Sequence, residues 1–122
     1  GQLYSYPFVP PAPARMTETQ ANHLNETGRG LLEWLVDSET SDGRRMVTEG
    51  NSTVAFIPVC ARYPYETWIV PRRRVSYIHE MTGEELGDFA RTLQTVLRKF
   101  DRMWNKPFPY LMTMYQAPFD GE

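Results

Sequence analysis

The sequence predicts an α+β fold in which helices pack on an antiparallel sheet. Two apolar, β-branched runs lie close together in the middle of the chain, and a long amphipathic helical pattern follows them. Ten prolines punctuate the connections, which favours short elements joined by irregular segments. At 122 residues the chain is long enough for one domain with a real core.

The beginning of the chain is expected to form a strand and then a helix. Residues 3–9 read as a strand, and the prolines of Pro10-Pro11-Ala12-Pro13 would end it because proline cannot donate a ladder hydrogen bond. The spacing in Thr17-Glu18-Thr19-Gln20 is that of a capping box, whose two end side chains satisfy each other's free backbone amides. A helix is therefore predicted to begin at this box.

A short helix, a loop and three strands are expected next. Apolar residues in 31–36 predict one or two helical turns, and the polar residues 37–44 predict a loop in which a glycine can adopt a positive φ. Residues 45–49 predict a strand. The β-branched and aromatic runs 53–60 and 66–70 are separated by a turn sequence, which predicts an antiparallel hairpin.

The last third of the chain predicts a long helix and a final strand. A second capping box, Thr82-Gly83-Glu84-Glu85, opens the helix, and apolar residues recur at helical spacing behind it. We expect this apolar stripe to lie on the sheet. The opposite face, expected in water, carries Asp88, Arg91, Gln94, Arg98, Lys99 and Arg102. Residues 110–115 are predicted to form a strand.

Composition narrows the classes of function. A formal net charge of -2 gives no basic excess for neutralising phosphates, so we expect no nucleic-acid partner. No apolar run approaches the roughly 18 residues that a membrane span needs, so we expect no membrane partner. The single cysteine cannot form an internal disulfide. A reducing, cytoplasmic setting fits these features.

Candidate chemistry is sparse when the residues are taken alone. We interpret His23 as a solvated surface histidine, and His79 beside Glu80 as a loop contact rather than an acid–base pair. Cys60 fits a small buried hydrophobe. The run 72–74 of three arginines could hold a phosphate, but a solvated strand end is the favoured interpretation. The aromatic residues of 63–68 could stack a nucleobase or could simply pack their own turn.

Two motifs carry a resemblance to a known family. The first is an apolar-Pro pair, an aromatic-Pro-aromatic-x-Thr turn and a strand ending Pro-Arg, which stands here as Ile57-Pro58 through Tyr63-Pro64-Tyr65-Glu66-Thr67 to Pro71-Arg72. The second is Phe108-Pro109-Tyr110-Leu111-Met112, near Ala117-Pro118. With a helix that opens between them, these motifs resemble the second half of galactose-1-phosphate uridylyltransferases. The resemblance implies a histidine-triad-like α+β fold, with an antiparallel sheet that is incomplete in this chain.

The resemblance extends to the first residues and implies a reaction. In the family a His-Pro-His motif runs into Gly-Gln and an aromatic strand, and Gly1-Gln2-Leu3-Tyr4 fits that register. The implied reaction moves a uridylyl group from UDP-glucose to galactose 1-phosphate through a uridylyl-histidine intermediate. Gln2 is the catalytic and substrate-binding residue carried over, as a donor to a phosphoryl oxygen. Because the nucleophile would precede Gly1, these 122 residues alone are expected to be inactive.

Metal sites and subunits are also implied by the resemblance. Zinc is expected in the full-length enzyme, with its ligands outside this chain. Family members with a second, iron-type metal take a Glu near Met16 and a His at Tyr115, and thioether and phenol groups replace these poorly. We expect no metal ligand in this chain and no second metal site. A homodimer is expected.

The resemblance divides the chain into three parts. Residues 1–13 would be the last strand of the first half and a Pro-rich connector, residues 14–44 linker helices, and residues 45–122 most of the second half. Two other functions stay open: another histidine-triad-like nucleotide phosphorylase or hydrolase, and a non-catalytic interaction domain.

Overall fold

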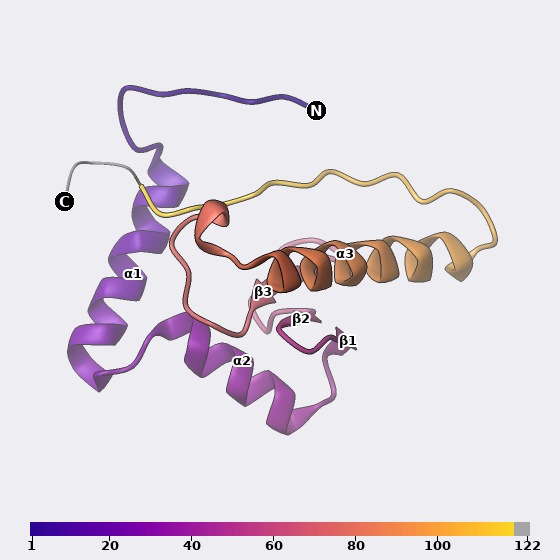
Figure 1. The fold of residues 1–122 in the computed structure, drawn as a ribbon, viewed down its shortest axis with the longest axis horizontal. Coiled ribbons are helices and arrows are strands. Elements are labelled where there is room, and N and C mark those ends of the chain that lie inside the picture. The colour runs from indigo at the N-terminus through magenta and orange to yellow at the C-terminus, as the bar shows by residue number, and fades with distance from the viewer. Residues whose placement is uncertain (119–122) are drawn as a thin grey trace.

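The computed structural model describes residues 1–118, which fold as three α-helices and a three-stranded antiparallel sheet. In chain order the elements are α1 (Pro11–Thr27), α2 (Leu31–Asp42), β1 (Met46–Glu49), β2 (Thr53–Phe56), β3 (Trp68–Pro71), the 3-10 helix η1 (Ile78–Glu80) and α3 (Gly83–Met103). Figure 1 shows the sheet between α2 and α3, with α1 beside α2. The predicted α+β fold is confirmed.

The sheet has β2 at its centre and hydrogen-bonds to a strand on each side. The order is β1-β2-β3, and both pairs are antiparallel. Val54 lies opposite Val70, and Phe56 lies opposite Trp68. All four residues of β2 are buried, because helices cover both faces of the central strand. The predicted hairpin of β2 and β3 and the predicted strand before it are confirmed.

The apolar core lies on the face of the sheet that α2 covers. Val36 of α2 packs with three strand residues, and partly buried neighbours surround them. The strand residues are Val54, Phe56 and Val70, and the neighbours are Leu32, Met46 and Trp68. Since successive strand side chains point to opposite faces, Thr53 and Ala55 point to the other face, the one toward α3.

The structure corrects the predicted start of the first helix. α1 begins at Pro11, so the proline run is its first turn and not a connector. Proline is favoured there because the first backbone N–H groups of a helix have no partner within the helix, and its fixed φ suits the turn. Thr17 lies inside α1, where its hydroxyl donates to the carbonyl oxygen of Pro13 at 3.0 Å, so the predicted capping box was wrong.

The second helix is longer than predicted. α2 continues to Asp42 and ends at Gly43, whose φ of +75° confirms the expected positive φ. Residues 37–42 were predicted to form a loop, yet they are helical. Glu39, in the middle of this stretch, is buried and is paired with Arg45 beyond the end of the helix. The Nε atom of Arg45 donates to the carboxylate oxygens of Glu39 at 2.9 and 3.1 Å.

The start of α3 is confirmed, and its faces differ from those predicted chiefly at Asp88. Val96 of the apolar stripe is buried, and the other residues placed on the water face are exposed as expected: Arg91, Gln94, Arg98, Lys99 and Arg102. Thr82 and Glu85 form the capping box, with the Glu85 backbone N–H donating to the Thr82 hydroxyl at 3.2 Å. The buried residues of α3 are Glu85, Asp88, Thr92 and Val96, so Asp88 faces the sheet and not water. Leu86, at the start of the apolar stripe, is 39% exposed. Hydrogen bonds from the strand turn to Asp88 fix this rotation of the helix.

Neither end of the described chain forms the strand predicted for it. Residues 1–10 and residues 107–118 are extended but belong to no sheet, and most of their side chains are exposed. An extended segment becomes a strand only when a neighbour pairs with its backbone, and no such pairing occurs within residues 1–118. The C-terminal segment instead lies beside the residues that precede η1, where the Ala117 N–H donates to the Ser76 carbonyl at 3.0 Å.

Candidate functional site

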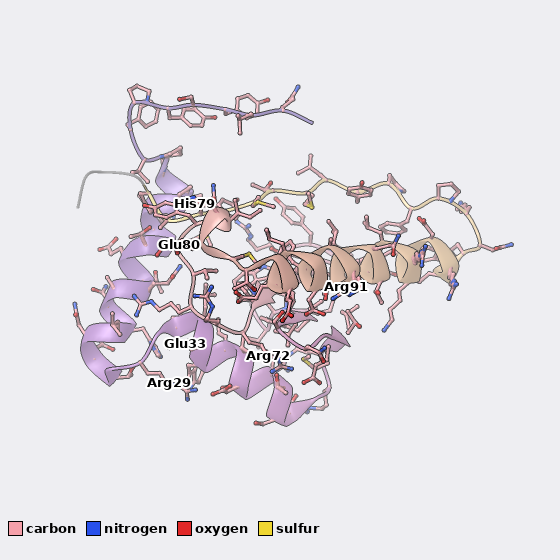
Figure 2. All side chains as sticks on the ribbon, in the orientation of Figure 1. Arg29, Glu33, Arg72, His79, Glu80 and Arg91 are labelled. Carbon is pink, nitrogen blue, oxygen red and sulfur yellow. The ribbon has the colours of Figure 1, made fainter. Side chains whose placement is uncertain are left out.

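The N-terminal segment presents the one catalytic residue that the sequence analysis assigns. Gln2 lies on extended, exposed backbone, and Figure 2 shows the side chains of this segment standing clear of the helices. The Oε1 atom of Gln2 accepts a hydrogen bond from the hydroxyl of Tyr4. The carboxamide is uncharged at any ordinary pH, so it can donate to an anionic oxygen without titrating.

A charged clamp joins the end of β3 to the start of α3. The guanidinium of Arg73 donates to both carboxylate oxygens of Glu85, at 3.1 and 2.9 Å, and to the carbonyl oxygen of Glu80 at 2.9 Å. Arg73, together with the backbone N–H of Thr82, lowers the pKa of Glu85 from its ordinary value of 4.5 to about 2. This carboxylate stays ionised and fully engaged, so it suits a structural role rather than proton transfer.

The three arginines in 72–74 lie at the surface, as the favoured interpretation expected: Arg73 and Arg74 are exposed, and the Arg72 side chain is 31% exposed. Arg72 pairs with Glu49 of β1, and Arg73 pairs with Glu85. The guanidinium groups of Arg72 and Arg73 are therefore also directed to carboxylates of the same chain, on β1 and on α3. This arrangement leaves little of the run free to bind a phosphate.

A second clamp ties α3 to the turn between β1 and β2. Asp88 accepts from the backbone N–H of Ser52 at 2.9 Å and from its hydroxyl at 3.2 Å. The Ser52 backbone donor is the main cause that lowers the pKa of Asp88. Gly50 lies against this carboxylate, and a Cβ atom there would come within 2.5 Å of Oδ2. The clamp borders a hollow of about 460 Å³ that Glu84 and Arg91 also line.

The histidines take up local contacts far from acid–base geometry. His23 is half-buried, with Nδ1 2.9 Å from the carbonyl oxygen of Arg29, so its interpretation as a solvated residue was wrong. His79 stacks on Tyr77 with ring centroids 5.4 Å apart. The Glu80 carboxylate accepts from the backbone N–H of Ser76 at 2.9 Å, so it serves the η1 turn, as the loop-contact interpretation expected (Figure 2).

The aromatic turn packs on itself and on the end of α3. Tyr65, at a φ of +64°, lies edge-on to Phe100, Trp104 and Phe108, with centroids 5.7 to 6.1 Å apart. Trp68 packs on Phe56 in the core. The packing interpretation is therefore favoured over nucleobase stacking. Cys60 in the same loop is exposed, which corrects its interpretation as a buried hydrophobe.

The side chains at the two family metal positions are not metal ligands of the usual kind. Met16 is half-buried on α1, and Tyr115 is exposed in the C-terminal segment. Within residues 1–118, no group of three or more His, Cys, Asp or Glu side chains is arranged to hold a metal ion. The absence of a second metal site in the whole protein stays a prediction.

Some structural residues carried no clear sequence signal. Asp88 was assigned to the water face because it lies opposite the apolar stripe, and only the glycine at position 50 hints that a side chain approaches the turn. Tyr4 was missed as a partner of Gln2, although residues two apart on extended backbone share a face.

Of the helices in the described part of the chain, none is both long and apolar enough to cross a membrane.

Comparisons with known proteins give matches over nearly the whole chain. The sequence profile described as "Galactose-1-phosphate uridyl transferase, C-terminal domain" matches residues 16–122. Proteins named galactose-1-phosphate uridylyltransferase from Thermotoga maritima and Streptomyces lividans are 34% and 37% identical over 100% and 98% of this chain. The chain spans 38% and 34% of their lengths.

Solved structures of proteins with related names superpose on this chain. A structure titled "Structure of uridylyltransferase" superposes with a TM-score of 0.85 at 31% identity, covering 92% of this chain and 35% of that one. An ADP-glucose phosphorylase from Arabidopsis thaliana, with bound ADP-glucose, superposes with a TM-score of 0.69 at 25% identity. That match covers 84% of this chain and 32% of the phosphorylase.

Proposed function

Because the chain belongs to the family of the galactose-1-phosphate uridyl transferase C-terminal domain, we propose that it is part of an enzyme that moves a uridylyl group from UDP-glucose to galactose 1-phosphate. The observation that carries the proposal is the similarity over essentially the whole chain to relatives that bear this name. The matched fold, at a TM-score of 0.85, gives further support.

The proposed chemistry is a two-step transfer through a histidine. An imidazole nitrogen attacks the α-phosphorus of UDP-glucose, a P–N bond forms, and the P–O bond to glucose 1-phosphate breaks. A phosphate oxygen of galactose 1-phosphate then attacks the same phosphorus, the P–N bond breaks, and UDP-galactose leaves. Imidazole suits both steps because it is nucleophilic near neutral pH and also departs readily from phosphorus.

In this scheme Gln2 donates from its amide to a phosphoryl oxygen as charge shifts during attack. An uncharged donor stabilises the reacting phosphoryl group without a proton of its own to lose. The exposed position of the side chain supports the role, since a large substrate must reach it.

The nucleophile in this proposal is neither of the histidines in the chain. His23 is engaged with the Arg29 carbonyl at the end of α1, and His79 is stacked on Tyr77 beside η1. We expect His23→Asn and His79→Asn in the full-length protein to retain uridylylation. If either substitution abolished the labelled intermediate while the protein remained folded, that residue would be the nucleophile.

The cofactor, subunit and compartment assignments belong to the same proposal. Zinc would be held by residues outside this chain. A homodimer or the remaining chain would cover the exposed apolar side chains, among them Leu3, Leu111 and Met112, since large apolar patches mark contact surfaces. A cytoplasmic setting is proposed from the single cysteine.

The test is transfer by the full-length protein that contains this chain. With UDP-glucose labelled in the α-phosphate, label should attach to the protein and then pass to galactose 1-phosphate to give UDP-galactose. Protein that is folded but neither accepts label nor forms UDP-galactose would contradict the proposal.

A second candidate is a phosphorylase that acts on a nucleotide sugar. It rests on the similarity to the ADP-glucose phosphorylase, which has a lower TM-score. Parallel assays with ADP-glucose plus inorganic phosphate would separate the two. Faster turnover of ADP-glucose than of UDP-glucose would favour the phosphorylase.

A further inference from the structure

The N-terminal segment carries Gln2 and three aromatic side chains in sequence. Gln2, Tyr4 and Tyr6 are two residues apart on extended backbone, which places them on the same side, and Phe8 follows at a bend of residues 7–8. The ring centroids of Tyr4 and Tyr6 are 6.3 Å apart at an interplanar angle of 20°, and those of Tyr6 and Phe8 are 5.6 Å apart. We call these four residues the N-terminal ladder.

The contact between the first two residues of the N-terminal ladder, Gln2 and Tyr4, is polar. The Tyr4 hydroxyl donates a hydrogen bond to Oε1 of Gln2. A glutamine carboxamide has an acceptor oxygen at one end and an NH₂ donor at the other, and rotation by half a turn exchanges them. A donor held against the oxygen favours one of the two orientations. The NH₂ group of Gln2 is then directed away from Tyr4.

We infer that Tyr4 is a positioning residue, whose hydroxyl holds the Gln2 carboxamide so that its NH₂ group faces the phosphoryl group in transfer. The inference rests on the proposed function, in which Gln2 supplies that donor. A carboxamide turned the other way would present its oxygen to an anionic phosphoryl oxygen and would repel it. Fixing the orientation before substrate arrives removes a reorganisation from the reaction step.

The other two residues of the N-terminal ladder, Tyr6 and Phe8, keep the Tyr4 ring in place. Tyr4 stacks on Tyr6, and Tyr6 packs against Phe8, so the hydroxyl extends from a ring that is supported along its length. Within residues 1–118 no hydrogen bond involves the Tyr6 hydroxyl. Tyr6 therefore provides a matched control: the same substitution, in the same ladder, without the contact to Gln2.

The experiment is a double-mutant cycle in the full-length protein that contains this chain. The single-turnover rate of protein uridylylation is measured at saturating UDP-glucose labelled in the α-phosphate. Tyr4→Phe should slow this step about threefold to tenfold, the effect of losing one ordinary hydrogen bond. Gln2→Ala should slow it about 10²–10³-fold. Tyr6→Phe should leave the rate within about twofold of wild type.

The coupling between the two sites separates positioning from a general structural effect. If Tyr4 acts only through Gln2, adding Tyr4→Phe to Gln2→Ala should change the rate by less than about twofold. Gln2→Glu keeps an acceptor for Tyr4 but has no NH₂ donor, so it should be as slow as Gln2→Ala. These results together would support the inference.

Several results would overturn it. Wild-type rates for Tyr4→Phe, or the same slowing from Tyr4→Phe in both backgrounds, would show that the hydroxyl does not act through Gln2. Normal uridylylation by Gln2→Glu would show that the NH₂ donor is not needed. If folded wild-type protein takes no label, the proposed function fails and the inference fails with it; a labelled wild type with an unaffected Tyr4→Phe removes the inference alone.

Discussion

Strand β2 and the N-terminal segment are both extended, yet they differ in almost every other respect. Val54, Ala55 and Phe56 of β2 are each 0% exposed, with a strand paired on either edge and a helix over each face. Leu3 in the N-terminal segment is 100% exposed. The buried strand provides stability, and the exposed segment carries the proposed chemistry. An extended backbone by itself therefore does not identify a sheet; its neighbours do.

The largest expected loss of stability is at the buried strand β2. Phe56→Ala removes the largest fully buried side chain and should lower the free energy of unfolding by about 3–5 kcal/mol. Leu3→Ala, at the exposed end, should stay within about 0.5 kcal/mol of wild type. Urea unfolding measures both. Equal losses would mean that the exposed segment is buried in solution.

A smaller loss is expected at the turn between β1 and β2. Gly50→Ala brings a Cβ atom within 2.5 Å of the Asp88 carboxylate, which Ser52 holds by two hydrogen bonds. Overpacking of this kind costs about 1–3 kcal/mol. Gly83→Ala is the matched control, because nothing lies within 4 Å of a Cβ there. Urea unfolding should separate the two variants, and a neutral Gly50→Ala would show that the clamp yields easily.

Acid should weaken the clamp at the start of α3. Because folding lowers the pKa of Glu85 from 4.5 to about 2, its contribution to stability is present above about pH 4.5 and is lost as the pH falls toward 2. Glu85→Gln should therefore be less stable than wild type at pH 7, with the difference narrowing over that interval. Unfolding curves at several pH values measure it.

Glu84→Gln is the control for the acid experiment. Glu84 precedes Glu85 and makes no ion pair within residues 1–118. Its substitution should leave the pH dependence of unfolding close to that of wild type. A Glu85→Gln variant whose deficit stays constant from pH 7 to pH 2 would contradict the assigned role.

The smallest effect is expected at the surface between α1 and α2. Arg29 pairs with Asp37, and these side chains are 48% and 60% exposed. Exposed pairs contribute little because water and salt screen them, so Arg29→Ala should cost no more than about 0.5 kcal/mol. A loss above about 1 kcal/mol in urea unfolding would show that this pair is more than a surface contact.

Local patterns predicted the elements whose determinants are themselves local. The capping box at Thr82 and the β-branched runs around Val54 and Val70 led to α3 and to the central hairpin, because those signals act within a few residues. The positive φ of Gly43 was also expected, although the glycine was placed within a loop because the polar residues before it hid the last turns of α2.

Predictions failed where a distant partner decides the outcome. Asp88 is polar and was placed toward water, but the Ser52 turn draws it into the protein. The extended ends were predicted as strands from their alternation, and no edge pairs with them in residues 1–118. Position 2 was assigned through family resemblance alone, since nothing in the local sequence distinguishes a catalytic glutamine from any other.

The most direct test of the central claim is the rate at which the full-length Gln2→Ala protein takes up label from UDP-glucose labelled in the α-phosphate. We predict a folded protein whose single-turnover uridylylation is about 10²–10³-fold slower than that of wild type. A Gln2→Ala protein that is labelled at the wild-type rate would contradict the placement of the chemistry in the exposed N-terminal segment.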